Sequence, residues 1–118
     1  MKSLVPYKRS DRVSPLIKKE LSLLFQFDIK DPRLANLSIS KVIVSDDLRH
    51  AKIFYSLYVP TVDQKEIDSG LKTAIGFLRR ELKKRLRLRI IPELVFFRDD
   101  SVDYSMKIES ILKGLKES

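Results

Sequence analysis

The sequence has no cysteine, a single histidine and only three glycines among its 118 residues. The lack of cysteine excludes a disulfide framework and thiolate chemistry, which agrees with a reducing compartment. His50 alone makes a histidine-rich metal site or a Ser-His-Asp triad a weak interpretation. No glycine-rich run ends in Lys-Ser or Lys-Thr, so a phosphate-cradling loop for nucleotide hydrolysis is not supported. We therefore expect a protein without cofactor, metal ion or enzymatic activity.

Long apolar runs are missing as well. No run of about 18 apolar residues exists, and residues 1 to 7 are too short for a signal peptide. We therefore expect a cytoplasmic protein that does not enter a membrane. Hydrophobic residues make up 43% of the chain and charged residues 34%, which provides enough apolar material for one core. We expect residues 1–118 to form a single domain, with residues 1–8 as a loose lead-in.

A helix with two chemically different sides is predicted from residue 64 onward. Its apolar residues recur at steps of three, four and one, the stripe that a 3.6-residue period places on one helix face. They are Ile67, Leu71, Ala74, Ile75, Leu78 and Leu82. The opposite face then carries Lys72, Arg79, Arg80, Lys83 and Lys84.

After Lys84 the apolar period changes to that of an extended chain. Basic and apolar residues alternate from Arg85 to Ile90, and a continued helix would turn Arg85 into the apolar stripe. We therefore expect the helix to end near Lys84. The expected inward-facing residues are Leu86, Leu88 and Ile90, and the outward-facing ones are Arg85, Arg87 and Arg89.

Basic charge is concentrated in this part of the chain. Residues 79 to 89 include seven basic residues and one acidic residue, a net charge of +6 out of the chain's +8. Ordinary surface helices mix both signs, so a patch this one-sided favours phosphate binding over a solvated helix face. Arginine binds phosphate bidentately and stacks on exposed bases, whereas lysine acts as a point charge. The candidate RNA-binding residues are Arg79, Arg80, Arg85, Arg87, Arg89, Lys83, Lys84 and Lys72.

The middle of the long helix contains Ala74-Ile75-Gly76. Glycine in a helix interior costs up to about 1 kcal/mol relative to alanine, which suggests a kink or a close backbone approach. A glycine that merely packs against the sheet is the alternative. The residues alone leave these interpretations open. For a kink at Ala74, Ile75 and Gly76, we expect Gly76→Ala to be destabilising or to impair binding.

Three strands accompany the helices. A strand from Leu37 to Ser45 shifts its apolar phase, which predicts a β-bulge near Ser40-Lys41. The second strand pairs antiparallel with the first, and the third, from Leu94 to Arg98, follows a helix and can therefore add parallel. The core face of the second strand is predicted to be Ala51, Ile53, Tyr55 and Leu57.

Two more helices complete the predicted order. The first carries the stripe Val13, Leu16, Ile17, Leu21, Leu24 and Phe25, and the last carries Ile108, Ile111, Leu112 and Leu115. Either Ser14, followed by Pro15, or Ser10 could cap the first helix. The order is α-β-β-α(kink)α-β-α, an α+β fold in which a small mixed sheet of three strands packs against helices.

The paired acids and the aromatic residues have simple structural interpretations. Asp46-Asp47 and Asp99-Asp100 stand where turns and helix caps prefer aspartate, so general acid or base work is not expected. His50 is expected to close the hairpin. Phe54, Tyr55 and Tyr58 could stack on bases, but we expect most of them to belong to the core.

The element order is that of a type II KH domain, which normally clamps single-stranded nucleic acid with a GxxG turn. This chain has no GxxG and carries Ala74-Ile75-Gly76 in its place. Six segments, taken in chain order, resemble the ribosome-binding factor A family. The resemblance runs from about Arg9 to Leu112. The segments are residues 29–34 (IKDPRL), 45–52 (SDDLRHAK), 74–79 (AIGFLR), 86–89 (LRLR), 92–94 (PEL) and 99–101 (DDS).

The resemblance implies a type II KH-like domain without enzymatic activity. It implies an assembly factor that binds 16S rRNA in free or immature 30S particles and assists late maturation and 5′-end processing of that RNA. It also implies support of growth in the cold, an interhelical kink at Ala74 and Gly76, and ribosome-assembly GTPases as further partners of what we expect to be a monomer. The chain departs from the family pattern at Pro15, where the first helix usually runs uninterrupted, and at Ser105, where glycine is common.

Three alternatives stay open from the residues alone. The chain could be a generic KH-like binder of RNA or single-stranded DNA, without ribosome specificity. It could also be a protein-interaction module whose basic face docks an acidic partner. An amphipathic membrane helix is weaker, because the apolar face is needed to cover the sheet and no tryptophan offers an interfacial anchor.

Overall fold

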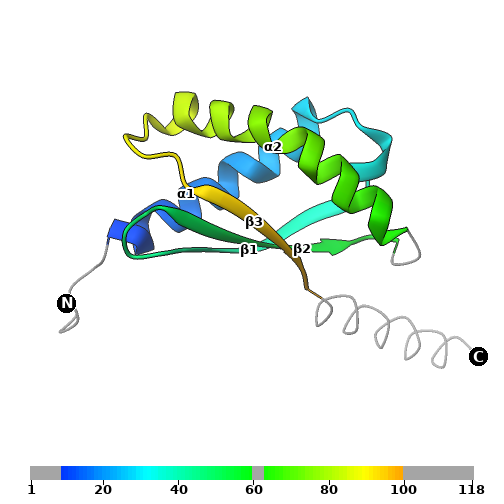
Figure 1. Ribbon diagram of the computed structural model, residues 1–118, viewed down its shortest axis with the longest axis horizontal. Coiled ribbons are helices and arrows are strands. Elements are labelled where there is room, and N and C mark those ends of the chain that lie inside the picture. Colours follow the sequence, from blue (N-terminus) through cyan, green and yellow to red (C-terminus); the bar gives the residue numbers. More distant parts are fainter. Residues whose placement is uncertain (1–8, 60–62, 100–118) are drawn as a thin grey trace, which may run out of the picture.

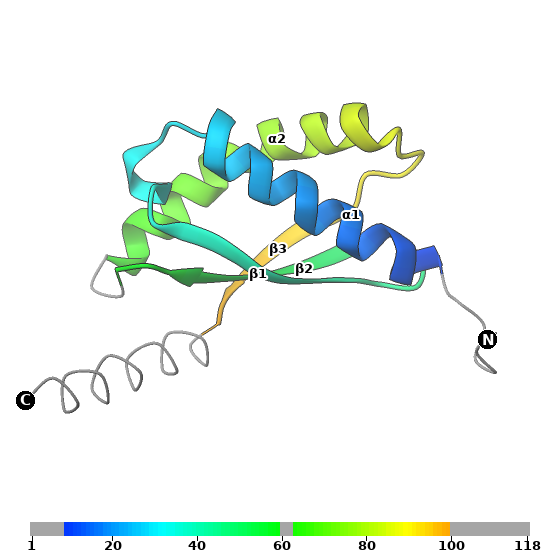
Figure 2. The same ribbon diagram turned by 180° about the vertical axis from the view of Figure 1, so that it is seen from behind.

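Two helices lie on one face of a three-stranded sheet in the computed structural model, which describes residues 9–59 and 63–99 (Figures 1 and 2). The α+β architecture expected from the sequence is confirmed. The expected last helix, the turn at Asp100-Ser101 and the lead-in over residues 1–8 lie outside the described residues. The elements are α1 (Arg9–Leu23), η1 (Leu24–Asp28), η2 (Pro32–Leu34), β1 (Leu37–Val44), β2 (His50–Leu57), α2 (Gln64–Leu86) and β3 (Glu93–Arg98).

The sheet is mixed, with strand order β1-β2-β3. The central strand β2 pairs antiparallel with β1 and parallel with β3, as predicted. A parallel pair cannot be joined by a tight hairpin, because the chain must return to the starting end of the sheet. The helix α2 makes this return, and it therefore has to cross one face of the sheet.

A β-bulge interrupts the pairing of β1 with β2 at the predicted place. Ile39 is opposite Tyr55 and Lys41 is opposite Phe54, so Ser40 is the extra residue. The Ser40 hydroxyl donates to the Phe54 carbonyl oxygen at 3.1 Å. The bulge therefore allows the apolar residues on both sides of it to share the core face.

The core lies between the sheet and the two helices. All four predicted inner residues of β2 are buried, and Ile17 and Leu21 of α1 and Leu78 and Leu82 of α2 are fully buried against them.

Two expectations about buried residues were wrong. Leu16 leaves the α1 stripe and is 49% exposed. Of Phe54, Tyr55 and Tyr58, only Tyr55 belongs to the core, because Tyr58 is 65% exposed and Phe54 is half-buried.

The first helix starts earlier than either predicted cap. It is already helical at Arg9, the first described residue, and Pro15 lies inside it. The Ser14 hydroxyl donates to the Ser10 carbonyl oxygen at 2.8 Å and accepts from the Val44 backbone N–H at 3.2 Å. Ser14 is therefore a link between α1 and β1. Packing of the buried stripe on the sheet outweighs the hydrogen bond that proline removes.

The long helix α2 is continuous from Gln64 to Leu86, and it changes direction near its middle (Figures 1 and 2). The close backbone approach considered at Gly76 is not there. A Cβ atom at that exposed position would meet only the end of the Arg80 side chain, at 3.5 Å. The close approach is at Gly70 instead, where a Cβ atom would lie 3.0 Å from Leu34, which belongs to η2.

The two glycines should therefore respond in opposite ways to alanine. Contrary to the destabilisation expected from the sequence, Gly76→Ala should raise the free energy of unfolding by up to about 1 kcal/mol, because a Cβ atom there meets open space and the helix-propensity cost is relieved. Gly70→Ala should lower it by about 1 kcal/mol, because overpacking against Leu34 costs roughly 1–3 kcal/mol and exceeds the propensity gain. Urea unfolding of both variants measures the difference. Equal stabilities would contradict the packing described for Gly70.

Candidate nucleic-acid interface

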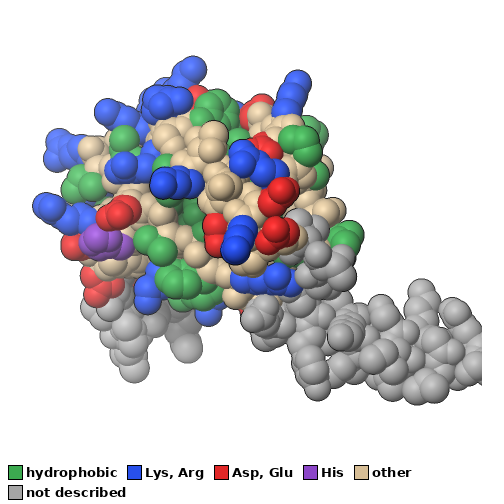
Figure 3. Space-filling model, turned by 45° about the vertical axis from the view of Figure 1, so that its right-hand side comes forward, with side chains coloured by type: hydrophobic (Ala, Val, Ile, Leu, Met, Phe, Trp, Pro, Cys, Tyr) green, Lys and Arg blue, Asp and Glu red, His purple; other side chains and the backbone are tan. Residues whose placement is uncertain are grey.

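The C-terminal half of α2 and the loop after it form a basic surface. It consists of Lys72, Arg80, Lys83, Lys84, Arg87 and Arg89, all exposed. Burial of Leu78 and Leu82 against the sheet turns the intervening helix positions outward. Figure 3 shows Lys and Arg side chains gathered along the top and upper left of the molecule, over α2. Within residues 9–59 and 63–99, these six side chains make no hydrogen bond or ion pair.

Arg79 is half-buried and is engaged by the protein itself. Its Nε donates to the Pro92 carbonyl oxygen and its Nη2 to the Ile91 carbonyl oxygen, both at 3.2 Å. The guanidinium group therefore fixes the loop that leads into β3. Arg79 was predicted to bind RNA. In the structure its guanidinium group instead binds two carbonyl oxygens of the protein and positions the loop.

Arg85 also faces the protein, contrary to the prediction that it would point outward. Because α2 continues through Leu86, Arg85 lies on the side of the helix that faces α1 and η1. It pairs with Asp28 at 2.7 Å, with Glu20 at 3.5 Å and with Glu81 at 3.4 Å. Burial acts to lower the pKa of Arg85, but the hydrogen bonds that Arg85 donates to Asp28 and Glu20, with the negative charge of Asp28, outweigh it and leave the pKa raised. The guanidinium group stays charged and joins three segments.

The helix ends at Leu86, two residues later than expected for an end near Lys84, and Arg87 is its C-cap. Arg87 adopts a left-handed conformation, with φ 51° and ψ 42°, which stops the helix and turns the chain toward β3. Leu88 packs against the core as predicted, but Ile90 is 44% exposed. Arg87 and Arg89 thus extend the basic surface beyond the end of the helix.

Asp47 and His50 occupy structural positions in the connection between β1 and β2. Asp47 accepts from the Ser45 hydroxyl at 2.6 Å and from the Arg49 backbone N–H at 3.0 Å, and these bonds lower the pKa of Asp47. It therefore stays ionised and is a poor general acid. The His50 backbone closes the hairpin through the Ser45 hydroxyl and backbone N–H, as predicted. Among the described residues there is no cluster that could hold a metal ion, nor a helix long and apolar enough to cross a membrane.

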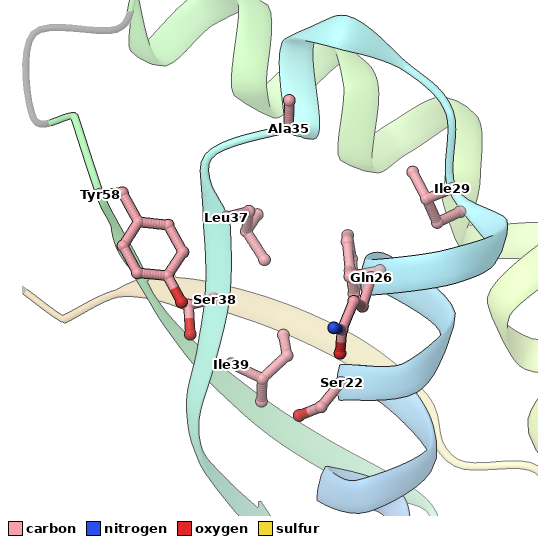
Figure 4. Close-up of a pocket in the computed structure, with 9 residues that line it drawn as sticks. Ser22, Gln26, Ile29, Ala35, Leu37, Ser38, Ile39 and Tyr58 are labelled. Carbon is pink, nitrogen blue, oxygen red and sulfur yellow. The ribbon is translucent and has the colours of Figure 1, made fainter.

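A hollow of about 450 Å³ lies between the end of α1, η1 and β1, away from the basic surface. Figure 4 shows Ser22 and Gln26 from the helical side and Leu37 and Ile39 from β1 around this space. No charged side chain lines it, so it offers nothing to pair with phosphate. The basic surface is therefore the stronger candidate for an anionic ligand.

The family comparison agrees with the fold and the charge distribution. The family model described as Ribosome-binding factor A matches residues 9–112. The chain belongs to the ribosome-binding factor A family. Ribosome-binding factor A from Brevibacillus brevis is 48% identical over 107 residues, covering 91% of this chain and 88% of its own length. The Geobacter metallireducens protein is 43% identical over 109 residues and covers 92% of both.

Solved structures of this family have the same fold. The solution structure of a putative ribosome-binding factor A from Thermotoga maritima has a TM-score of 0.63 and 28% identity, over 80% of this chain and 91% of its own. A Thermus thermophilus model, fitted into a cryo-EM map of a complex of the 30S subunit with ribosome-binding factor A, has a TM-score of 0.61. It is 25% identical and covers 71% of this chain and 88% of its own. The likeness supports the type II KH-like assignment.

Arg85 should be a stability residue, in contrast with its neighbour Lys84. Arg85→Gln should lower the Tm, because three carboxylates at one point would lose their shared cation. Lys84→Gln, which removes an exposed charge from the next position, should leave the Tm unchanged. Thermal unfolding at low ionic strength measures both. Indistinguishable Tm values would show that the ion-pair network has no net effect on folding.

Proposed function

We propose that the protein binds 16S rRNA in free or immature 30S particles and assists late maturation of the small subunit, including processing of the rRNA 5′ end. The observation that carries this proposal is the basic surface, with six exposed cations that no described acid neutralises. Membership of the ribosome-binding factor A family supports the ribosome as the partner. The Thermus thermophilus relative in the 30S complex supports the small subunit in particular.

The binding mechanism is electrostatic docking on the rRNA backbone. Arg80, Arg87 and Arg89 supply planar guanidinium groups for bidentate phosphate contacts, and the lysines supply point charges. The bend of α2 sets the angle between the first half of the helix and the cationic half. Arg79 and Arg85 act indirectly, because they hold the loop and α1 in the positions that orient this surface.

Binding, and not bond cleavage, is the proposed activity. The protein holds local RNA structure while other factors process it, which fits a surface rich in cations. The family resemblance adds ribosome-assembly GTPases as factors that act on the same particles. Such a protein works in the cytoplasm as a monomer.

Co-sedimentation with ribosomal particles tests the proposal in a native extract. The unmodified protein should migrate with free small subunits on a sucrose gradient, whereas a variant with Arg80→Glu, Lys83→Glu and Lys84→Glu should stay at the top. A control variant with Lys18→Glu, Lys30→Glu and Lys65→Glu makes the same change in net charge at exposed positions elsewhere. It should still migrate with the subunit.

Two outcomes would count against the proposal. If the unmodified protein stays at the top, the ribosome is not its main partner, and a generic RNA or single-stranded DNA binder becomes the better interpretation. If the triple variant on α2 still co-migrates with the small subunit, the protein binds through a different surface.

The salt dependence of RNA binding tests the phosphate contacts directly. If about five basic groups neutralise phosphates, a plot of log affinity against log salt should have a slope of roughly −3.5 to −4.5. Fluorescence anisotropy with a labelled 16S rRNA fragment over a series of salt concentrations gives this slope. A value near zero would contradict the phosphate mechanism.

A further inference from the structure

The second face of the sheet carries exposed apolar side chains, and none of the described elements covers it. Both helices lie on the opposite face (Figures 1 and 2). The open face exposes Ile43 (42%), Val95 (41%) and Phe97 (41%) to solvent. Large apolar side chains gathered in this way usually mark an interaction site.

The strand register places these residues in two adjacent rows across the sheet. Ile43, Lys52 and Val95 form one row across the three strands. Lys41, Phe54 and Phe97 form the adjacent row, and the rings of Phe54 and Phe97 stack with their centroids 5.5 Å apart. The apolar side chains are therefore concentrated on β3 and the adjoining Phe54, and Lys52 lies between Val95 and Ile43.

The sequence after β3 has the pattern of a helix that could cover these apolar side chains. Ile108, Ile111, Leu112 and Leu115 fall within an arc of about 100° on a helix of 3.6 residues per turn. A helix over residues 101–115 would be about 22 Å long, and a six-residue strand such as β3 extends about 20 Å. Chain length and apolar pattern both match the open face.

The point of attachment favours this segment over other occupants. Asp99 is the last described residue, and its backbone N–H donates to the Tyr55 carbonyl oxygen at 2.7 Å, so the chain leaves directly from the sheet. A short tether gives an effective concentration of order millimolar, whereas a second copy must be recruited from dilute solution. A base would also have to compete with the existing stacking of Phe54 on Phe97.

We propose that residues 100–118 fold back as an amphipathic helix and dock on the open face of the sheet. The aspartates at 99 and 100 then stand at the reversal between β3 and this helix, a position that favours acidic caps. The docked helix covers Val95, Phe97 and Ile43 and completes a three-layer arrangement of helices, sheet and helix. The basic surface on α2 stays free on the other side of the molecule.

Engineered cysteine pairs test the docking in the full chain, because the sequence contains no cysteine of its own. Val95→Cys is combined with Ile108→Cys or Ile111→Cys on the apolar stripe, and with Ser110→Cys or Lys113→Cys as controls on the opposite side of the predicted helix. Mild oxidation followed by non-reducing electrophoresis, with mass spectrometry of the intact chain, measures intramolecular disulfide formation.

At least one stripe pair should form an intramolecular disulfide roughly tenfold faster, or more, than either control pair. Docking brings only cysteines on the apolar side of the helix close to the cysteine at position 95. Equal rates for stripe and control pairs would overturn the proposal, since they indicate an undocked tail. Predominant disulfide-linked dimers would overturn it as well, because a second copy would then cover the face. In addition, Ile111→Asp should increase binding of an apolar dye to the folded protein, whereas Lys113→Asp should not.

Discussion

The parallel pairing of β2 with β3 is the constraint on which the rest of the structure depends. It obliges the connecting chain to cross the sheet, and α2 makes this crossing with Leu71, Leu78 and Leu82 buried. Once that side of the helix is fixed, Lys72, Arg80, Lys83 and Lys84 are left facing solvent. The position of the basic surface is therefore a consequence of how the core is built.

Two arginines convert this arrangement into a fixed orientation. Arg79 ties α2 to the loop before β3, and Arg85 ties it to α1 and η1 through carboxylates. The guanidinium groups of Arg79 and Arg85 bind groups of the protein itself, whereas the six cations of the basic surface are available to bind a ligand. This division between positioning and binding residues explains how a surface so rich in like charge can sit on a well-ordered helix.

Much of the fold could be predicted because its signals are local. The phase shift in β1 located the bulge at Ser40, the apolar stripe located the buried side of α2, and the chain order predicted the parallel strand. The helix boundaries could not be predicted as well. Packing kept α1 helical through Pro15, and the alternating pattern after Lys84 suggested an extended chain although the helix continued.

The candidate site was predictable in its composition but not in its division of roles. Glu81, four residues before Arg85, was a visible sign that this arginine has a partner. Asp28 and Glu20 are far from Arg85 in the sequence, and Leu34 is far from Gly70. No local sequence pattern therefore reveals these contacts. Such contacts arise only when the elements pack, and they decide which basic residues stay free.

Site-specific photo-crosslinking within native small-subunit particles tests the central claim most directly. A photoreactive amino acid is placed at the position of Lys83, on the basic surface, or at that of Lys30, outside it. The account predicts crosslinks to 16S rRNA from position 83 and few or none from position 30. Crosslinks from position 83 to protein alone, or RNA crosslinks only from position 30, would contradict it.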